Sequence, residues 1–334
     1  MRFGIAFQTN KTPAEYAVLA QLVDRLPFDV VSVYNDLGFQ PALGPLLMMA
    51  PHLHRATLGP AALNPFLVHP VEIAGQAAVL DLATNGRAYL GLARGAWLDR
   101  AGVHPHQGVE ALRDAIHIVG QLLSRRTQRY NGTVFTLAED LVLGYQPLRA
   151  DPPIMVGTWG DRAAELAGEL AREVKVGGSA NPGVAPRIRA AIKRGERRAG
   201  RPAGTVGLCF GAVTVVDRDG PTARALARRE IALYLPVVAK LDRQSDPEWL
   251  ARVSAAAARG DADAVVRDVS DEILARFAFA GTPDDIVQQV VALAAAGVDR
   301  VELGTPHGQR PDEAIKLLGQ QVVPQVHALL GDPT

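Results

Sequence analysis

The stretch from residue 152 to 178 carries the clearest chemical signal in this chain of 334 residues. A short apolar run, 154–156, leads into Gly157-Thr158-Trp159-Gly160, and an Ala/Leu/Glu-rich helix follows directly. A second apolar run then stops at Gly177-Gly178. Glycines permit close backbone approach, and the free N–H groups at the start of a helix attract anions. The pattern therefore indicates a phosphate site, and it also fits an ordinary strand-to-helix turn.

Polar side chains also follow other apolar runs. Asn35 and Asp36 follow one run, Gln8 follows another, and Arg94-Gly95 follow a third. A partly buried Asp36 could act as a general acid, and the Arg94 guanidinium could pair with a phosphate or carboxylate. The alternatives are polar rim residues and an arginine that is salt-bridged to a neighbouring loop.

The residues that follow these apolar runs can form one site only if the runs are parallel strands whose carboxyl ends lie at the same edge of a sheet. Eight runs have strand character, with amphipathic helices between them: 3–7, 29–33, 57–63, 88–92, 154–156, 173–176, 206–216 and 300–303. Most are continuous apolar stretches, which is typical of parallel strands buried on both faces. Helices over 12–26 and 283–296 begin at Thr-Pro caps. The sequence therefore predicts an α/β fold, a single (β/α)8 TIM-type barrel over residues 1–334, with its active site at the carboxyl ends of the strands.

Two connections are too long for plain crossovers, and they follow the fourth and seventh predicted strands. Residues 93–153 contain a predicted helix near 107–123 and a strand-like tail, TQRYNGTVFTL. Residues 217–298 contain at least three predicted helices and no predicted strand. Insertions at this end of a barrel usually form lids or interfaces.

The balance of charge and the single cysteine limit the possible partners. Thirty-five basic residues match thirty-five acidic ones, so no overall field favours nucleic acid or an anionic membrane. Cys209 stands alone, which excludes an internal disulfide and is compatible with a reducing cytosol. No apolar run approaches the roughly 20 residues of a membrane span, and the chain opens on a strand without a signal-peptide core. We expect a cytoplasmic protein that acts on a small molecule.

The histidines do not suggest a metal site. His52 and His54 are two residues apart, as are His104 and His106, but no carboxylate–cysteine set at ligand spacing accompanies either pair. We therefore expect no metal. The Gly-x-Gly-x-x-Gly, P-loop and Gly-x-Ser-x-Gly motifs are also missing from the sequence, so Rossmann, kinase and serine-hydrolase interpretations lack support.

Five segments in a fixed order then carry a family resemblance. They are LGPAALNPFLVHPVEIAGQAAVLDLATNGRAYLGLARG (58–95), TQRYNGTVFTL, PPIMVGTWGDRAAELAGELA, EVKVGG, and GTPDDIVQQVVALAAAGVDRVEL (281–303). With them the chain resembles the bacterial-luciferase-like proteins. Within that superfamily it resembles the branch that uses the deazaflavin coenzyme F420, typified by methylenetetrahydromethanopterin reductase. The resemblance runs nearly from end to end.

The resemblance implies a coenzyme site at the ends of four strands. The tip of the third strand, with Ala61, Ala62, Leu63 and Asn64, would back the coenzyme ring. Many relatives carry a non-proline cis peptide there, which by position would be Ala61–Ala62. The remaining implied coenzyme residues are Arg94, Gly95, Gly157, Thr158, Trp159, Gly160, Gly177 and Gly178.

The resemblance also points to the catalytic end of the site. Relatives often have an Asp-His pair at the end of the second strand, where this chain has Asn35 and Asp36 and no histidine. Asp36 therefore becomes the candidate proton donor, with Asn35 beside it.

Three functions follow from these expectations. The first is an oxidoreductase that uses coenzyme F420 to move hydride to or from the C=C or C=N bond of a small substrate. The second is a monooxygenase of the same fold that uses FMN and oxygen, and the third is a non-catalytic flavin-binding protein. The resemblance also implies a homodimer.

Overall fold

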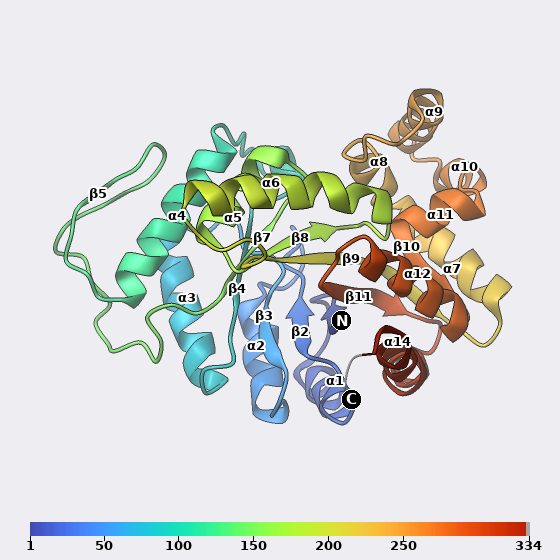
Figure 1. The fold of residues 1–334 in the computed structure, drawn as a ribbon, viewed down its shortest axis with the longest axis horizontal. Coiled ribbons are helices and arrows are strands. Elements are labelled where there is room, and N and C mark those ends of the chain that lie inside the picture. The colour runs from blue at the N-terminus through green and yellow to red at the C-terminus, as the bar shows by residue number, and fades with distance from the viewer. Residues whose placement is uncertain (332–334) are drawn as a thin grey trace.

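Parallel strands form a closed barrel at the centre of the molecule (Figure 1), in a computed structural model that describes residues 1–331. The strands are β1 (Arg2–Phe7), β2 (Val30–Val33), β3 (Thr57–Pro60), β4 (Leu90–Ala93), β7 (Ile154–Gly157), β8 (Glu173–Gly177), β9 (Gly207–Val216), β10 (Ala278–Gly281) and β11 (Arg300–His307). The order around the sheet is β3-β2-β1-β11-β9-β8-β7-β4, and β10 pairs with β9 off this path. Isolated bridges from Leu58 to Ala88 and from Leu63 to Leu92 join β3 to the β4 side and close the ring. The predicted TIM-type barrel is confirmed.

One strand of this sheet, β10, was not predicted. On one edge of β9, strand β8 pairs only as far as Gly211, and β10 takes over from Val213 to Val216. β11 pairs along the opposite edge of β9. The prediction that residues 217–298 contain no strand is therefore wrong. The four residues of β10, Ala-Phe-Ala-Gly, are too few to show the alternation of a strand, and they follow α11 (Asp271–Phe277) directly.

Helices surround the barrel on its outer side (Figure 1). They are α1 (Pro13–Asp24), α2 (Leu43–Met49), α3 (Pro70–Ala83), α5 (Asp161–Leu170), α6 (Ala185–Arg198), α12 (Pro283–Ala295), α13 (Pro311–Leu317) and α14 (Val323–Leu330). Short turns of other helix types are η1 (Ala50–His52), η2 (Leu98–Ala101), η3 (Pro182–Val184) and η4 (Leu318–Val322). Thr12 and Thr282 each form a capping box with the residue three positions later, so the predicted helix starts are confirmed.

Two insertions extend the barrel at the predicted places. The first, between β4 and β7, contains α4 (Gly108–Leu123) and the hairpin of β5 (Tyr130–Asn131) and β6 (Thr136–Leu137). The second, between β9 and β10, contains α7 (Gly220–Ala232), α8 (Leu235–Val238), α9 (Pro247–Ala258), α10 (Ala262–Arg267) and α11 (Asp271–Phe277). The second insertion has an apolar core of its own, in which Trp249 stacks on Phe277 at 6.4 Å between ring centroids. In Figure 1 the hairpin and α7–α11 lie at opposite ends of the molecule.

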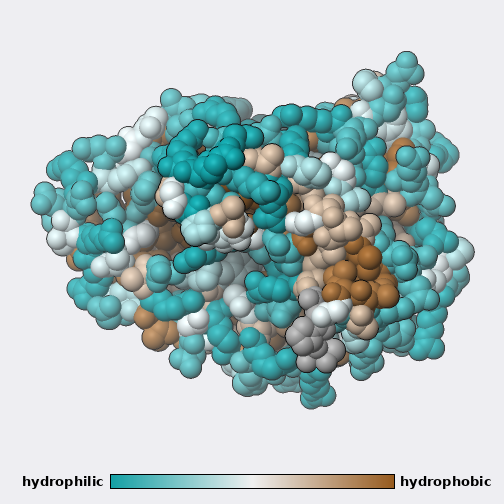
Figure 2. Space-filling view, in the orientation of Figure 1, coloured by the Kyte–Doolittle hydropathy of each residue, from teal (hydrophilic) through white to brown (hydrophobic). Residues whose placement is uncertain are grey.

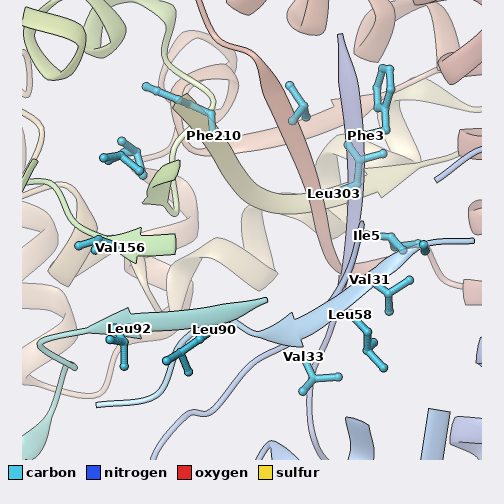
Figure 3. Close-up of a cluster of buried hydrophobic side chains, with 14 of the residues drawn as sticks. Phe3, Ile5, Val31, Val33, Leu58, Leu90, Leu92, Val156, Phe210 and Leu303 are labelled. Atoms are coloured by element: carbon cyan, nitrogen blue, oxygen red, sulfur yellow. The ribbon is translucent and has the colours of Figure 1, made fainter. Parts of the chain in front are cut away.

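The two faces of the barrel strands differ in character. Phe3, Ile5, Val31 and Leu303 are buried, and Figure 3 shows them pointing away from the barrel interior. Side chains alternate along a strand, so their neighbours point inward. Several of those neighbours are small or charged, which corrects the prediction that most strands are apolar on both faces.

An ion-pair network fills the barrel interior. Glu302 accepts hydrogen bonds from Lys175 Nζ, from Ser32 Oγ at 2.6 Å and from Arg300 Nη1 at 2.9 Å. Arg300 also makes a bidentate pair with Glu173, at 2.9 and 2.6 Å. Burial alone would raise the pKa of Glu302, but Lys175 and Arg300 hold it at about 2. Room for these side chains comes from glycine, since a Cβ on Gly211 would lie 3.1 Å from Lys175 Cε.

Most of the face shown in Figure 2 is hydrophilic. Among the helices of residues 1–331, none combines the length and the apolarity that crossing a membrane requires.

A buried histidine ends the last barrel strand. His307 follows a cis Thr305–Pro306 bond and has a φ of 73°. Its ring contacts Phe7 edge-on at 5.4 Å between centroids, and Nε2 lies 3.2 Å from the Leu303 carbonyl oxygen. Burial lowers the pKa of His307 to about 4. The imidazole is therefore neutral in the folded protein at neutral pH.

This histidine predicts a specific loss of stability in mild acid. The unfolded chain takes up a proton near the ordinary histidine pKa of 6.5, whereas native His307 does so only near 4. The stability it contributes is complete above pH 6.5 and is lost as the pH falls toward 4, and the loss at pH 5 is about 2 kcal/mol. We expect His307→Asn, which tolerates the positive φ, to remove this part of the pH dependence. Urea unfolding of both proteins at pH 7.5 and pH 5 measures it, and an unchanged difference between the two pH values would contradict the assignment.

Candidate active site

The carboxyl ends of the barrel strands form a single rim, because all barrel strand pairs are parallel. Every site residue predicted from the sequence lies on this rim: Asn35 and Asp36 after β2, Ala61, Ala62, Leu63 and Asn64 after β3, Arg94 and Gly95 after β4, Gly157, Thr158, Trp159 and Gly160 at β7, and Gly177 and Gly178 at β8. The structure therefore brings residues from five strands to one end of the barrel.

The bond between Ala61 and Ala62 is a non-proline cis peptide, at the position that the resemblance implied. Ala61 N donates to the Val33 carbonyl of β2 at 2.8 Å. Leu63 N donates to the Gly91 carbonyl on the β4 side at 2.9 Å. This segment is thus tied to both neighbouring strands at the rim.

Asn64 and Gly95 fit against each other. Asn64 is buried, and its Oδ1 accepts hydrogen bonds from Phe66 N at 2.9 Å and Leu67 N at 3.2 Å. Gly95 has a φ of 88°, and any Cβ there would run into the Asn64 amide. These two residues, each predicted separately for the site, therefore shape the loop through packing.

Arg94 is exposed at the rim, with its methylene groups over Gly108. Within residues 1–331 it has no ion-pair partner. The alternative interpretation, in which Arg94 forms a salt bridge to a neighbouring loop, is therefore wrong for the described residues. The guanidinium is available to an anion.

The loop from Gly157 to Gly160 has the predicted strand-to-helix geometry. Gly160 is the N-cap of α5, and its N–H is bound by Thr158 Oγ1 at 2.9 Å. That hydroxyl oxygen accepts, so its hydrogen remains free to donate. Trp159 donates its indole N–H to the Gly177 carbonyl at 2.8 Å and packs against the main core. Trp159 is therefore a packing residue of the rim that links β7 to β8.

Two arginines stand beside this loop. Asp161, the first residue of α5, pairs with Arg187 and, at 3.2 Å, with Arg243. Arg187 also donates to the Trp159 carbonyl at 3.0 Å. The three side chains together carry one net positive charge next to the predicted phosphate loop.

The glycine pair at the end of β8 has two different environments. A Cβ on Gly177 would meet no heavy atom within 4 Å, so the space beside it is open. Gly178 has a φ of 73° and packs against Val238, the last residue of α8. The open space is therefore beside the residue whose carbonyl accepts the Trp159 hydrogen bond.

The polar end of the rim centres on Asp36. Gln8 Nε2 donates to Asp36 Oδ2 at 2.8 Å, which fixes the carboxylate beside the end of β1. Asn35 Oδ1 accepts from Ala42 N at 2.9 Å, so its carbonyl holds the chain that enters α2. Of Asn35 and Asp36, only Asp36 has a carboxylate, and that carboxylate lies at the rim.

Tyr234 also belongs to this end of the rim, and sequence reasoning missed it. It lies in the second insertion, between α7 and α8, and is half-buried. Burial and then Asp36 raise the pKa of Tyr234, against a smaller lowering by a hydrogen bond from Gln8. No motif surrounds this tyrosine in the sequence, so only the folding of the insertion reveals it.

Comparisons with known proteins agree with this architecture. The family model described as luciferase-like monooxygenase matches residues 1–300. The 5,10-methylenetetrahydromethanopterin reductase of Archaeoglobus fulgidus is 27% identical over 335 residues, covering 98% of this chain and 100% of its own. An F420-dependent glucose-6-phosphate dehydrogenase of Amycolatopsis mediterranei is 24% identical, over 94% of each chain. The solved coenzyme F420-dependent tetrahydromethanopterin reductase of Methanopyrus kandleri superposes with a TM-score of 0.89 at 25% identity, covering 97% of this chain and 99% of its own.

Proposed function

This chain belongs to the luciferase-like monooxygenase family, and from that premise we propose that it is an oxidoreductase that uses coenzyme F420 to move hydride to or from a small organic substrate. The observation that carries the proposal is the full-length likeness to the F420-dependent reductase of Methanopyrus kandleri. The substrate bond we propose is a C=C or C=N bond.

The rim residues fit such a coenzyme. The open space beside Gly177 leaves room for a ligand against the backbone. The free hydroxyl hydrogen of Thr158, the first N–H groups of α5 and the unpaired Arg94 suit a phosphate or carboxylate. The Ala61–Ala62 segment presents small side chains to a flat ring. A deazaflavin has carbon where flavin has a redox nitrogen, so it transfers hydride and does not activate oxygen.

The chain's own residues then have separate tasks. Ala61 and Ala62 position the ring, and the Gly157–Gly160 loop with Arg94 binds the anionic part. Asp36, held by Gln8, holds or supplies the proton that a hydride-reduced substrate atom requires. Binding both reactants at one rim supplies proximity and orientation.

A second candidate is an FMN-dependent monooxygenase. The family to which the chain belongs favours it, because that family is named for monooxygenases. The same loop also suits a flavin phosphate. The non-catalytic flavin-binding alternative differs only in lacking turnover.

We expect the purified protein to bind coenzyme F420 at least tenfold more tightly than FMN, a difference of about 1.4 kcal/mol. Titration of the protein against each cofactor, followed by the change in cofactor fluorescence, measures this ratio. Equal or reversed affinities would favour the FMN enzyme. Tight binding of F420 without turnover of any substrate in a screen with the reduced coenzyme would favour the non-catalytic alternative.

Three further statements from the sequence belong to this proposal. We propose that residues 1–334 act as one domain, that the protein is a homodimer, and that it works in the cytoplasm. The family resemblance supports the first two, and the sequence composition supports the third.

A further inference from the structure

The second insertion folds back over the barrel rim at α8. Val238, at the end of α8, packs against Gly178 at the end of β8. Tyr234, just before α8, interacts with Gln8 after β1 and with Asp36 after β2. The segment 234–238 therefore spans the rim from β8 to β2.

The first insertion reaches the same tyrosine from the other side. The rings of Trp97 and Tyr234 are 6.0 Å apart between centroids and inclined by 55°. Trp97 is partly exposed and has a φ of 54°, an unusual conformation for a bulky residue. The two insertions thus meet over the rim through this aromatic pair.

Charge and hydrogen bonding determine which chemical groups of a substrate can lie against Tyr234. Two acidic groups act on Tyr234, Asp36 and more weakly Glu230, and Gln8 contacts both Tyr234 and Asp36. Lys11 Nζ lies nearby but donates to the Gln8 carbonyl at 2.9 Å and to Asn10 Oδ1 at 2.8 Å. The raised pKa of Tyr234 keeps its phenol protonated at neutral pH, so it serves as an uncharged donor.

We propose that Tyr234 is a substrate-binding residue of this site, whose hydroxyl donates a hydrogen bond to an acceptor atom beside the bond that exchanges hydride. Trp97 packs over the same molecule and limits its size. The reacting end of the substrate is uncharged or cationic, because an anionic one would meet the Asp36 carboxylate, and the nearby Lys11 ammonium is already engaged by Gln8 and Asn10. This inference rests on the proposed function and adds a residue that the insertion alone supplies.

The test compares Tyr234→Phe with Tyr145→Phe. Tyr145 is exposed in the first insertion, with its hydroxyl 3.5 Å from the Gly75 carbonyl oxygen and away from the rim residues. Each protein is titrated with F420 and then assayed with the reduced coenzyme and 5,10-methylenetetrahydromethanopterin as the probe. We expect Tyr234→Phe to lower kcat/KM for the probe at least tenfold with the Kd for F420 within twofold of wild type. Tyr145→Phe should leave both values within twofold.

The possible results separate this inference from the proposed function. Wild-type turnover with an unchanged Tyr234→Phe variant overturns the role of Tyr234 and leaves the F420 enzyme standing. A wild-type protein that binds F420 but neither binds nor reduces the probe overturns the hydrogen bond proposed from Tyr234 to this substrate, and the coenzyme assignment survives. A wild-type protein that does not bind F420 overturns both.

Discussion

Replacing Gly177 by valine is expected to weaken binding of coenzyme F420 by at least a hundredfold, which corresponds to about 2.7 kcal/mol. The glycine ends β8 beside open space, so the Cβ of a larger residue would meet no atom of the protein within 4 Å. A β-branched residue is also compatible with a strand. The coenzyme, which we place in that space, would lose its room. Titration with F420 measures the change, and thermal unfolding verifies that the fold is retained.

Gly144→Val is the matched control for this experiment. Gly144 is exposed in the first insertion, and a Cβ there would also meet no heavy atom within 4 Å. Its substitution should leave F420 affinity unchanged. If Gly177→Val binds F420 as tightly as the control, the coenzyme does not pass along the end of β8, and the glycine pair is a tight turn without a ligand role.

Asp36→Asn is expected to lower turnover by on the order of a hundredfold or more, with little change in coenzyme affinity. Asparagine keeps the shape and can still accept the hydrogen bond from Gln8, but it cannot provide or take up the proton. Single-turnover oxidation of reduced F420 by an authentic substrate isolates this step from product release.

The control for Asp36 is Asp140→Asn, a substitution of an exposed acid in the first insertion. It should behave as wild type. Near-full turnover of Asp36→Asn would assign a structural role to Asp36 at the end of β2. The proton would then come from another group at the rim or from water.

Much of the barrel could be predicted because its signals are local. The capping boxes at Thr12 and Thr282 are sequence patterns that form within one turn. The apolar runs marked eight of the strands. β10 was missed because four residues at the end of a helix carry no periodic signal, and the strand exists only where β8 leaves an edge of β9 unpaired.

The site was predicted where it lies on the strands and missed where it lies on the insertions. The glycine loop at β7 and the residues after β2 and β3 belong to strand ends, which the barrel brings together whatever the details of packing. Tyr234 reaches the rim only through the fold of a long insertion. Its position depends on tertiary contacts such as that between Val238 and Gly178.

The interior charges carried a signal that was visible in the sequence. EVKVG and RVELG alternate charged or small residues with apolar ones, which is the period of a strand with one polar face. The alternation predicts which side chains point into the barrel, and the structure bears it out in Lys175 and Glu302.

The same charges determine how the barrel can close. Lys175 and Glu302 come from β8 and β11, which β9 separates, so their pairing reports the alignment of three strands at once. If β11 slid by two residues in one direction, Arg300 would take the place of Glu302 and face Lys175 with like charge. A slide by two in the other direction would put Gly304 there and leave the ammonium group alone in the interior. Each misaligned barrel would therefore enclose an uncompensated charge, at several kcal/mol. An apolar interior would tolerate such slips far better, so the ions select one alignment during assembly even where they add little to the stability of the finished protein.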